Sequence, residues 1–145
     1  MVYARVTQRV MALFVDGIVL LVLTGLLEVV GLPVYDHPRL ADGNAGPTLT
    51  WSPLGIAVSV LMAGLYYVFF ECSTHQGTPG KIALGLRVTD LEGGRIGPLR
   101  SAARYFAKYL SAAILTIGFF MAIFTRRRQA LHDLIAGTVV IGRGP

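Results

Sequence analysis

Two charged residues lie within the first apolar segment of the chain and could carry chemistry. Arg9 and Asp16 are seven positions apart, which is about two turns of an α-helix, so both lie on one face of that helix. Asp16 stands inside MALFVDGIVLL, where every other residue is apolar or glycine. A carboxylate at the centre of a membrane helix costs roughly 2.5–3.5 kcal/mol, so Asp16 must face protein or water, pair with a cation, or take up a proton.

Two interpretations of Asp16 follow from this position. In the first, the carboxylate alternates between a proton and a monovalent cation, and Arg9, which can snorkel to the inner interface, tunes its pKa. In the second, Asp16 is structural and forms an interhelical ion pair with Arg104 or Lys108, or a hydrogen bond to the third apolar segment. The residues by themselves leave both interpretations open.

A second carboxylate of interest is Asp133, which lies beside His132 in the stretch RRRQALHDLIAGTVV. Its structural interpretation is an interfacial ion pair with Arg9 or Arg5. Its functional interpretation is a group that gathers cations at the cytoplasmic mouth of a pathway. Of the two, we favour the structural ion pair.

Two further charged residues follow the second apolar segment. Glu71 stands at the end of that segment, and we expect it at the membrane interface in contact with water. Lys81 closes GTPGK, which resembles a phosphate-binding loop but lacks both the earlier glycine and the Ser or Thr after the lysine. We interpret this stretch as a turn that ends the helix and places Lys81 at the lipid headgroups.

Nothing in the sequence indicates an enzyme or a metal centre. Cys72 is the single cysteine, so an intrachain disulfide is excluded. Cys72 and His75 have metal-like spacing and His132 could add a ligand, but one thiol and scattered histidines do not make a zinc site. No Ser-His-Asp or Cys-His arrangement stands out, and we expect no catalytic residue, no metal and no cofactor.

The composition is that of an integral membrane protein. Of the 145 residues, 54% are hydrophobic and 14% are charged, whereas soluble domains carry about 25% charged residues. The net charge of +5 comes from basic residues clustered beside apolar runs, which indicates a cytoplasmic membrane face near anionic lipids and not nucleic-acid binding. We interpret the N-terminal apolar run as an uncleaved membrane helix, because Asp16 interrupts it and no cleavage site follows.

The elements that must position these groups form a single all-α membrane domain covering the whole chain. The sequence predicts transmembrane helices at about 8–32 and 51–71, joined by a loop rich in Pro, Gly, Asp and Asn. A third hydrophobic segment follows at about 101–125. A cytoplasmic β-hairpin is predicted at about 84–97, and the β-branched run in GTVVIG predicts a strand at about 137–142 that can add to it.

The distribution of basic residues predicts the orientation in the membrane. Arginines precede the first helix and basic residues crowd the segment after the second, so the N-terminus is cytoplasmic in a multi-pass protein of the inner or plasma membrane. A full crossing by residues 101–125 would place the arginines at 126–128 outside. A bent or re-entrant segment avoids this and keeps the last strand on the side of the hairpin, so we favour it over a plain crossing.

Several of these motifs together resemble the RDD family of small membrane proteins. They are Arg9 with Asp16, then QGTPGKIALGLRV after the second helix, and RRRQALHDLIAGTVV near the end of the chain. The resemblance covers about 6–141 and implies that Arg9, Asp16 and Asp133 are the arginine and two aspartates for which the family is named. It also implies a role in transport, because some members are associated with sodium–proton exchange.

Two functions are therefore expected. The first is sodium–proton antiport-like exchange of a monovalent cation through Asp16, with a homo-oligomer supplying enough helices. The alternative is a non-transporting membrane subunit or assembly factor of a larger complex, in which Arg9, Asp16 and Asp133 form a structural charge cluster. Further charged residues that either function could use are Glu71, Lys81, Arg104, Lys108 and His132.

Overall fold

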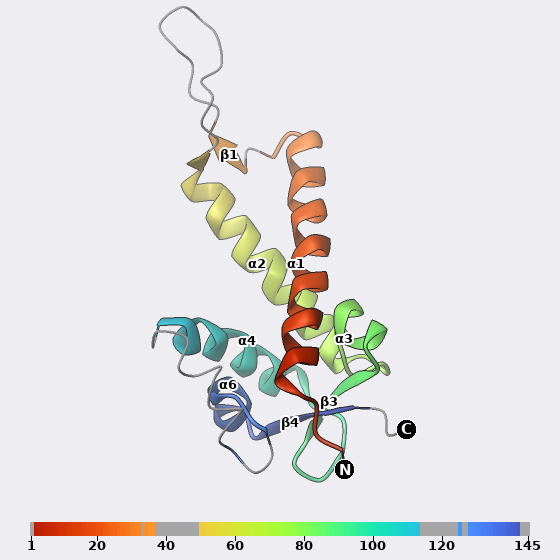
Figure 1. Ribbon diagram of the computed structural model, residues 1–145. Helices are drawn as coiled ribbons and strands as arrows, with labels where there is room; N and C mark the ends of the chain where they lie inside the picture. Colours follow the sequence, from red (N-terminus) through yellow and green to blue (C-terminus); the bar gives the residue numbers. More distant parts are fainter. Residues whose placement is uncertain (1, 33, 37–49, 114–124, 126–127, 143–145) are drawn as a thin grey trace, which may run out of the picture. The chain divides into compact units, whose positions relative to one another are not determined.

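The computed structural model describes residues 2–32, 34–36, 50–113, 125 and 128–142. The chain divides into two units, Met1–Gly17 with Gly64–Pro145, and Ile18–Ala63. Figure 1 shows the elements in chain order: α1 (Val6–Val29), β1 (Tyr35–Asp36), β2 (Thr50–Trp51), α2 (Pro53–Cys72), α3 (Pro79–Ala83), β3 (Leu86–Asp90), α4 (Pro98–Ala113), α6 (Leu131–Ile135) and β4 (Thr138–Gly142).

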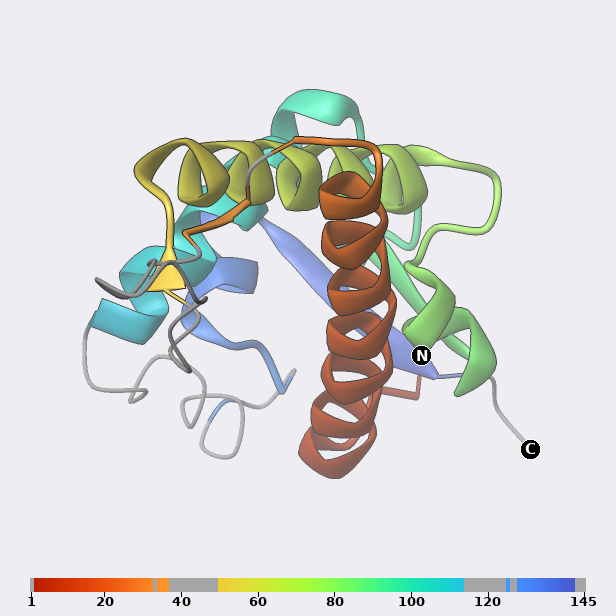
Figure 2. The ribbon, with the colours of Figure 1, turned by 90° about the horizontal axis from the view of Figure 1, so that it is seen from above.

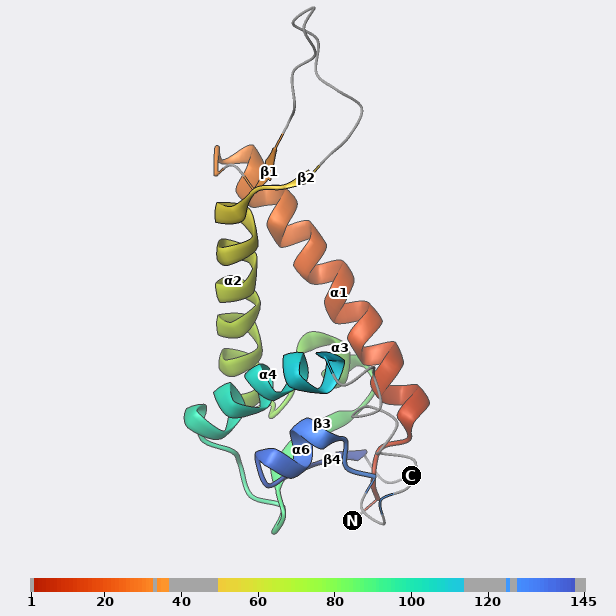
Figure 3. The same ribbon diagram turned by 90° about the vertical axis from the view of Figure 1, so that its left-hand side faces the viewer.

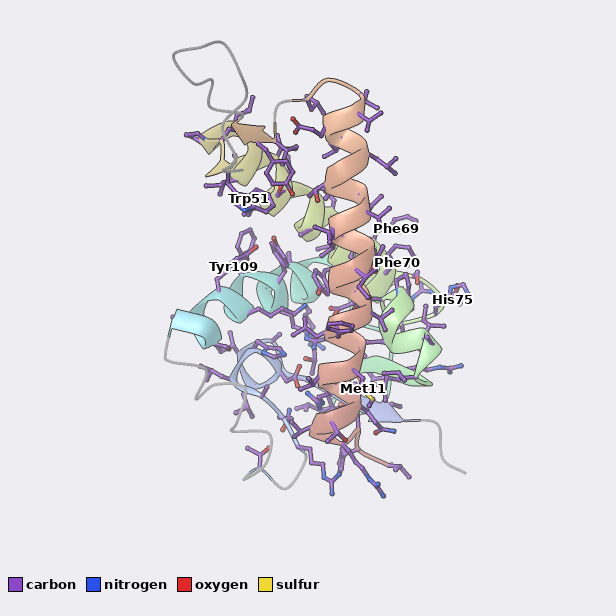
Figure 4. The ribbon with its side chains drawn as sticks, turned by 45° about the horizontal axis from the view of Figure 1, so that its top comes forward. Met11, Trp51, Phe69, Phe70, His75 and Tyr109 are labelled. Carbon is purple, nitrogen blue, oxygen red and sulfur yellow. The ribbon has the colours of Figure 1, made fainter. Side chains whose placement is uncertain are left out.

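The two long helices are the candidate membrane spans. α1 has 24 residues and α2 has 20, with mean hydropathies of 2.5 and 1.9 over their most apolar windows. Only 17% of each window is buried, whereas the core helix of a soluble protein is buried along most of its length. Large apolar side chains such as Met11 and Phe69 are exposed instead (Figure 4), which suits contact with lipid. The spans predicted at 8–32 and 51–71 coincide with these helices to within a few residues.

The unit Ile18–Ala63 contains the ends of both helices that are joined by the loop. β1 and β2 pair antiparallel there, with Tyr35 opposite Trp51 (Figure 3). Glu28 of α1 accepts hydrogen bonds from the backbone N–H groups of Val34 and Tyr35, which fixes the chain where it leaves the helix. Most of the loop predicted at 33–50 lies outside the described residues.

The other unit is built around the sheet of β3 and β4. These strands pair antiparallel from Leu86 opposite Gly142 to Asp90 opposite Thr138. The N-terminal residues join the same sheet, since Tyr3 bridges Ile141 and the N–H of Ala4 donates to the carbonyl of Val140 (Figure 2). Residues 3 and 4, β3 and β4 therefore meet in one sheet.

The strand predicted at 137–142 is present as β4, but the hairpin predicted at 84–97 is reduced. β3 is its first strand, and the rest contributes one bridge, from Thr89 to Arg95. The physical reason is that β4 is a better partner. Val139 and Val140 are buried together with Leu86 and Val88, whereas the residues around Arg95 are mostly exposed.

α4 occupies the first half of the predicted third hydrophobic segment. It is amphipathic, because Ser101, Arg104 and Ser111 are fully buried while Phe106 and Leu110 are exposed. It packs against α6 (Figures 1 and 3). Residues 114–124 lie outside the described part of the chain, so whether 101–125 crosses the membrane or re-enters stays a prediction.

Candidate functional site

Asp16 is buried in a cradle of uncharged hydrogen-bond donors. Its side chain is 1% exposed. The hydroxyl of Tyr66 and the N–H of Gly80 donate to Oδ1, each over 2.9 Å, and the hydroxyl of Thr78 donates to Oδ2 over 2.5 Å. The ion pair predicted between Asp16 and Arg104 or Lys108 is absent among the described residues. This form of the structural interpretation is therefore not seen, because Arg104 pairs with Glu71 and Asp133 and Lys108 contacts the ring of Tyr67.

The cradle explains the glycine of GTPGK. A Cβ atom at Gly80 would lie 2.3 Å from the backbone oxygen of Ala12 and 2.9 Å from Oδ1 of Asp16. Real Cβ atoms do not approach backbone oxygens so closely, so α3 can lie against α1 only with glycine here. The GTPGK stretch, which the sequence predicts as a turn, thus also supplies Thr78 and Gly80 as donors to Asp16.

Asp133 forms the second buried carboxylate site. It is fully buried, and Arg104 Nη2 donates to its Oδ1 over 2.6 Å while Arg9 Nη1 donates to its Oδ2. The backbone N–H of Ala130 donates to the same Oδ2 over 3.3 Å. The pairing of Asp133 with Arg9, expected from the sequence, is therefore present in the structure.

Glu71 is the third buried carboxylate, and its predicted contact with water is wrong. Its side chain is 1% exposed. Lys81 Nζ donates to Oε1 over 2.5 Å, while the hydroxyl of Ser101 and Arg104 Nη1 donate to Oε2 over 3.0 and 3.2 Å. Burial is tolerated because two cations neutralise the carboxylate. Lys81 is buried in its ion pair with Glu71. It does not extend to the lipid headgroups, contrary to the prediction.

Arg104 links the Asp133 and Glu71 sites into one chain of ion pairs. It contacts both Glu71 and Asp133, so the series Arg9–Asp133–Arg104–Glu71–Lys81 is continuous. Its members come from α1, α6, α4, α2 and α3 in that order. We call this series the charge network.

The pKa values of groups outside the candidate spans follow from burial and charge. Burial acts to raise the pKa of Asp133, but Arg104 and Arg9 outweigh it and hold that pKa below its usual range. Burial lowers the pKa of Lys81, although Glu71 partly opposes this. Burial also lowers the pKa of His132 to about 3, so its imidazole is neutral at neutral pH.

A pocket of about 100 Å³ lies beside the network. Its charged wall includes Arg9, Asp16 and Lys108, and Val10 and Leu13 of α1 belong to its apolar wall. The ammonium group of Lys108 lies 3.3 Å from the ring centroid of Tyr67, which is a cation–π contact. In the part of the chain that the structure describes, no three His, Cys, Asp or Glu side chains are grouped so as to hold a metal ion.

Comparison with known proteins identifies relatives of this chain. The family model described as "RDD family" matches residues 3–137. The chain is similar to the uncharacterized protein YxaI of Bacillus subtilis (strain 168), with 32% identity over 92% of this chain and 93% of the relative. It is 31% identical to the uncharacterized protein RP437 of Rickettsia prowazekii (strain Madrid E), over 74% of this chain and 58% of that protein.

A further relative is the "Proline-rich antigen homolog" of Mycobacterium tuberculosis (strain ATCC 25618 / H37Rv). The identity is 29%, over 96% of this chain and 63% of the relative's length. No solved structure matches the chain. The relatives therefore contribute no assigned activity.

Proposed function

This chain belongs to the RDD family, and on that premise we propose that it is a multi-pass protein of the inner or plasma membrane with a cytoplasmic N-terminus. Family membership and two long apolar helices already indicate a membrane protein. The orientation is supported by basic residues beside the sheet-forming unit, including Arg5, Arg87 and Arg95.

The pairing of the sheet supports a third segment that returns to the side it left. α4 begins eight residues after β3, and β4 begins ten residues after Arg128. Five of those ten residues form α6, so this stretch can reach only about 25 Å, which is less than the roughly 30 Å of a hydrocarbon core. Because β3 and β4 are paired, residues 98 and 128 then belong on one side of the membrane.

For the activity, the geometry best supports a non-transporting membrane subunit or assembly factor held together by the charge network. The observation that carries this proposal is that Glu71 and Asp133 are each hydrogen-bonded by two cations and at least one further donor. Carboxylates occupied in this way have little capacity left for a travelling cation. Removing one partner of such a buried pair costs about 3–5 kcal/mol, so the network is suited to fixing the helices around the sheet.

Asp16 supports a second candidate, which is exchange of a monovalent cation against a proton. Of the three buried carboxylates, Asp16 makes no ion pair with any described residue, and its donors are two hydroxyls and one N–H. A carboxylate with uncharged partners can be neutralised by a proton or by sodium. We rank this candidate second because Arg9, Lys81, Arg104 and Lys108 line the same pocket and repel cations.

One transport experiment with a single variant separates the two candidates. We would reconstitute the purified protein in liposomes that contain a pH-sensitive dye and apply sodium, lithium and potassium jumps to the wild type and to Asp16→Asn. The structural proposal expects a folded wild type that gives no cation-driven pH change. A pH change that disappears in a folded Asp16→Asn protein would establish exchange instead.

The same preparation tests the network directly. Arg104→Met should lower the free energy of unfolding by about 3–5 kcal/mol, because Glu71 and Asp133 each lose a buried cation. The control Arg100→Met, an exposed residue on the same helix, should change it by no more than about 0.5 kcal/mol. Equal effects of the two substitutions would contradict the structural role.

A further inference from the structure

The pocket beside the charge network carries an inference beyond the proposed function, and one that does not depend on whether the protein transports ions. All residues that line the pocket lie within the unit Met1–Gly17 with Gly64–Pro145. The pocket has a polar wall from the network and an apolar wall that includes Val6, Val10 and Leu13 of α1. A ligand with a charged group and an apolar remainder would match both walls.

The charges around the pocket do not balance. Four cations line it, namely Arg9, Lys81, Arg104 and Lys108. Three buried carboxylates stand against them: Asp16 lines the pocket, and Glu71 and Asp133 pair with its cations. When all four basic side chains are protonated, one positive charge is left over, which a monovalent anion would neutralise.

Hydrogen-bond donors around the pocket are also in excess over acceptors. The carboxylate oxygens are occupied, but Nε and Nη2 of Arg9 and Nε of Arg104 are buried and find no acceptor among the described residues. The side chain of Arg104 is 1% exposed. The ammonium group of Lys108 contacts the face of the Tyr67 ring. Unpaired N–H groups on buried cations are costly, and an anion with several oxygens would satisfy them.

We propose that this pocket binds a phosphate group, with Arg9, Arg104 and Lys108 as its donors. Guanidinium groups suit phosphate because their N–H groups diverge toward several oxygens at once. A phosphodiester carries a single negative charge and would bring the pocket to neutrality. Two sources share this chemistry: the headgroup of an anionic lipid, whose apolar part would meet Val10 and Leu13, and free phosphate.

The test measures stabilisation by defined phosphate compounds. The purified protein in neutral detergent is heated with short-chain phosphatidylglycerol, short-chain phosphatidylcholine or inorganic phosphate at constant ionic strength. We expect phosphatidylglycerol to raise the unfolding temperature with a saturable dependence on concentration, and native mass spectrometry to show one bound lipid. Stabilisation by inorganic phosphate alone would support the same site with free phosphate as its ligand.

The variants decide whether the pocket is responsible. Lys108→Met removes a proposed donor that makes no ion pair with the described residues, and it should weaken binding roughly tenfold, as expected for a lost charged hydrogen bond. Arg100→Gln, an exposed cation on the same helix, should bind like the wild type. Val10→Phe places a larger side chain at the pocket wall without changing charge, and it should also weaken binding. This variant tests the pocket should Lys108→Met fail to fold. Equal binding by wild type and pocket variants, or no response to any phosphate compound, overturns the proposal.

Discussion

Arg104 is the residue that turns separate buried carboxylates into one network. It donates to Glu71 with one terminal nitrogen and to Asp133 with the other. A lysine at this position would offer one ammonium group and could not bridge two carboxylates with the same planar geometry. The pair Arg9–Asp133 is therefore only one end of a series that depends on a second arginine.

His132 should make stability fall on mild acidification. Its pKa is about 3 in the folded protein and 6.5 without the fold, so between these values the unfolded chain binds a proton that the folded chain does not. Stability is then lost as pH falls below 6.5, by at most about 1.4 kcal/mol per pH unit. We expect His132→Gln to flatten the dependence of unfolding free energy on pH between 6.5 and 4.

The range from pH 6.5 to 4 separates the contribution of His132 to stability from that of Asp133. The pKa of Asp133 is lowered by folding from 3.8, so the stability that Asp133 contributes is present above that value and is lost only at lower pH. His75, which is exposed, provides the control substitution His75→Gln. A wild-type protein whose stability is unchanged from pH 6.5 to 4 would contradict the burial of a neutral His132.

At the scale of elements, Gly80 should be needed for α3 to lie against α1. Gly80→Ala would drive a Cβ to 2.3 Å from the oxygen of Ala12, so we expect a loss of about 1–3 kcal/mol in unfolding free energy, as for other overpacked sites. The control is Gly97→Ala, where a Cβ would meet nothing within 4 Å. Chemical denaturation of both variants checks this, and equal stability would show that the contact is not needed.

Some elements of the structure can be predicted from the sequence more fully than others. Both long helices follow from apolar runs long enough to span a bilayer, and β4 follows from its β-branched residues. The partners of Asp16 could not be predicted, because Tyr66, Thr78 and Gly80 lie 50–64 positions away and their donors carry no charge. The polar face of α4 did leave a signal, since Ser101, Arg104 and Lys108 recur at helical spacing among apolar residues.

At the scale of the whole molecule, the composition predicts a membrane protein. Whether residues 101–125 add a further crossing of the membrane depends on a tertiary contact. Hydropathy alone gives residues 101–125 the length of a short span. The pairing of β3 with β4 and of Ala4 with Val140 supplies the missing constraint, because strands cannot pair across a bilayer. The paired residues lie 48 or more positions apart in the chain, so no local sequence pattern reveals the contact.

Site-directed labelling tests this topology. In a Cys72→Ser background, we would place single cysteines at the exposed positions Glu92 and Ile135 and at Asn44, and treat intact cells with a membrane-impermeant maleimide. Asn44→Cys should react in intact cells, because the chain between two spans faces outside when the N-terminus is cytoplasmic. Glu92→Cys and Ile135→Cys should react only after permeabilisation, since β3 and β4 hold them on one side. If Glu92→Cys and Ile135→Cys reacted from opposite sides, residues 101–125 would cross the membrane fully, and the paired sheet could not exist in the inserted protein.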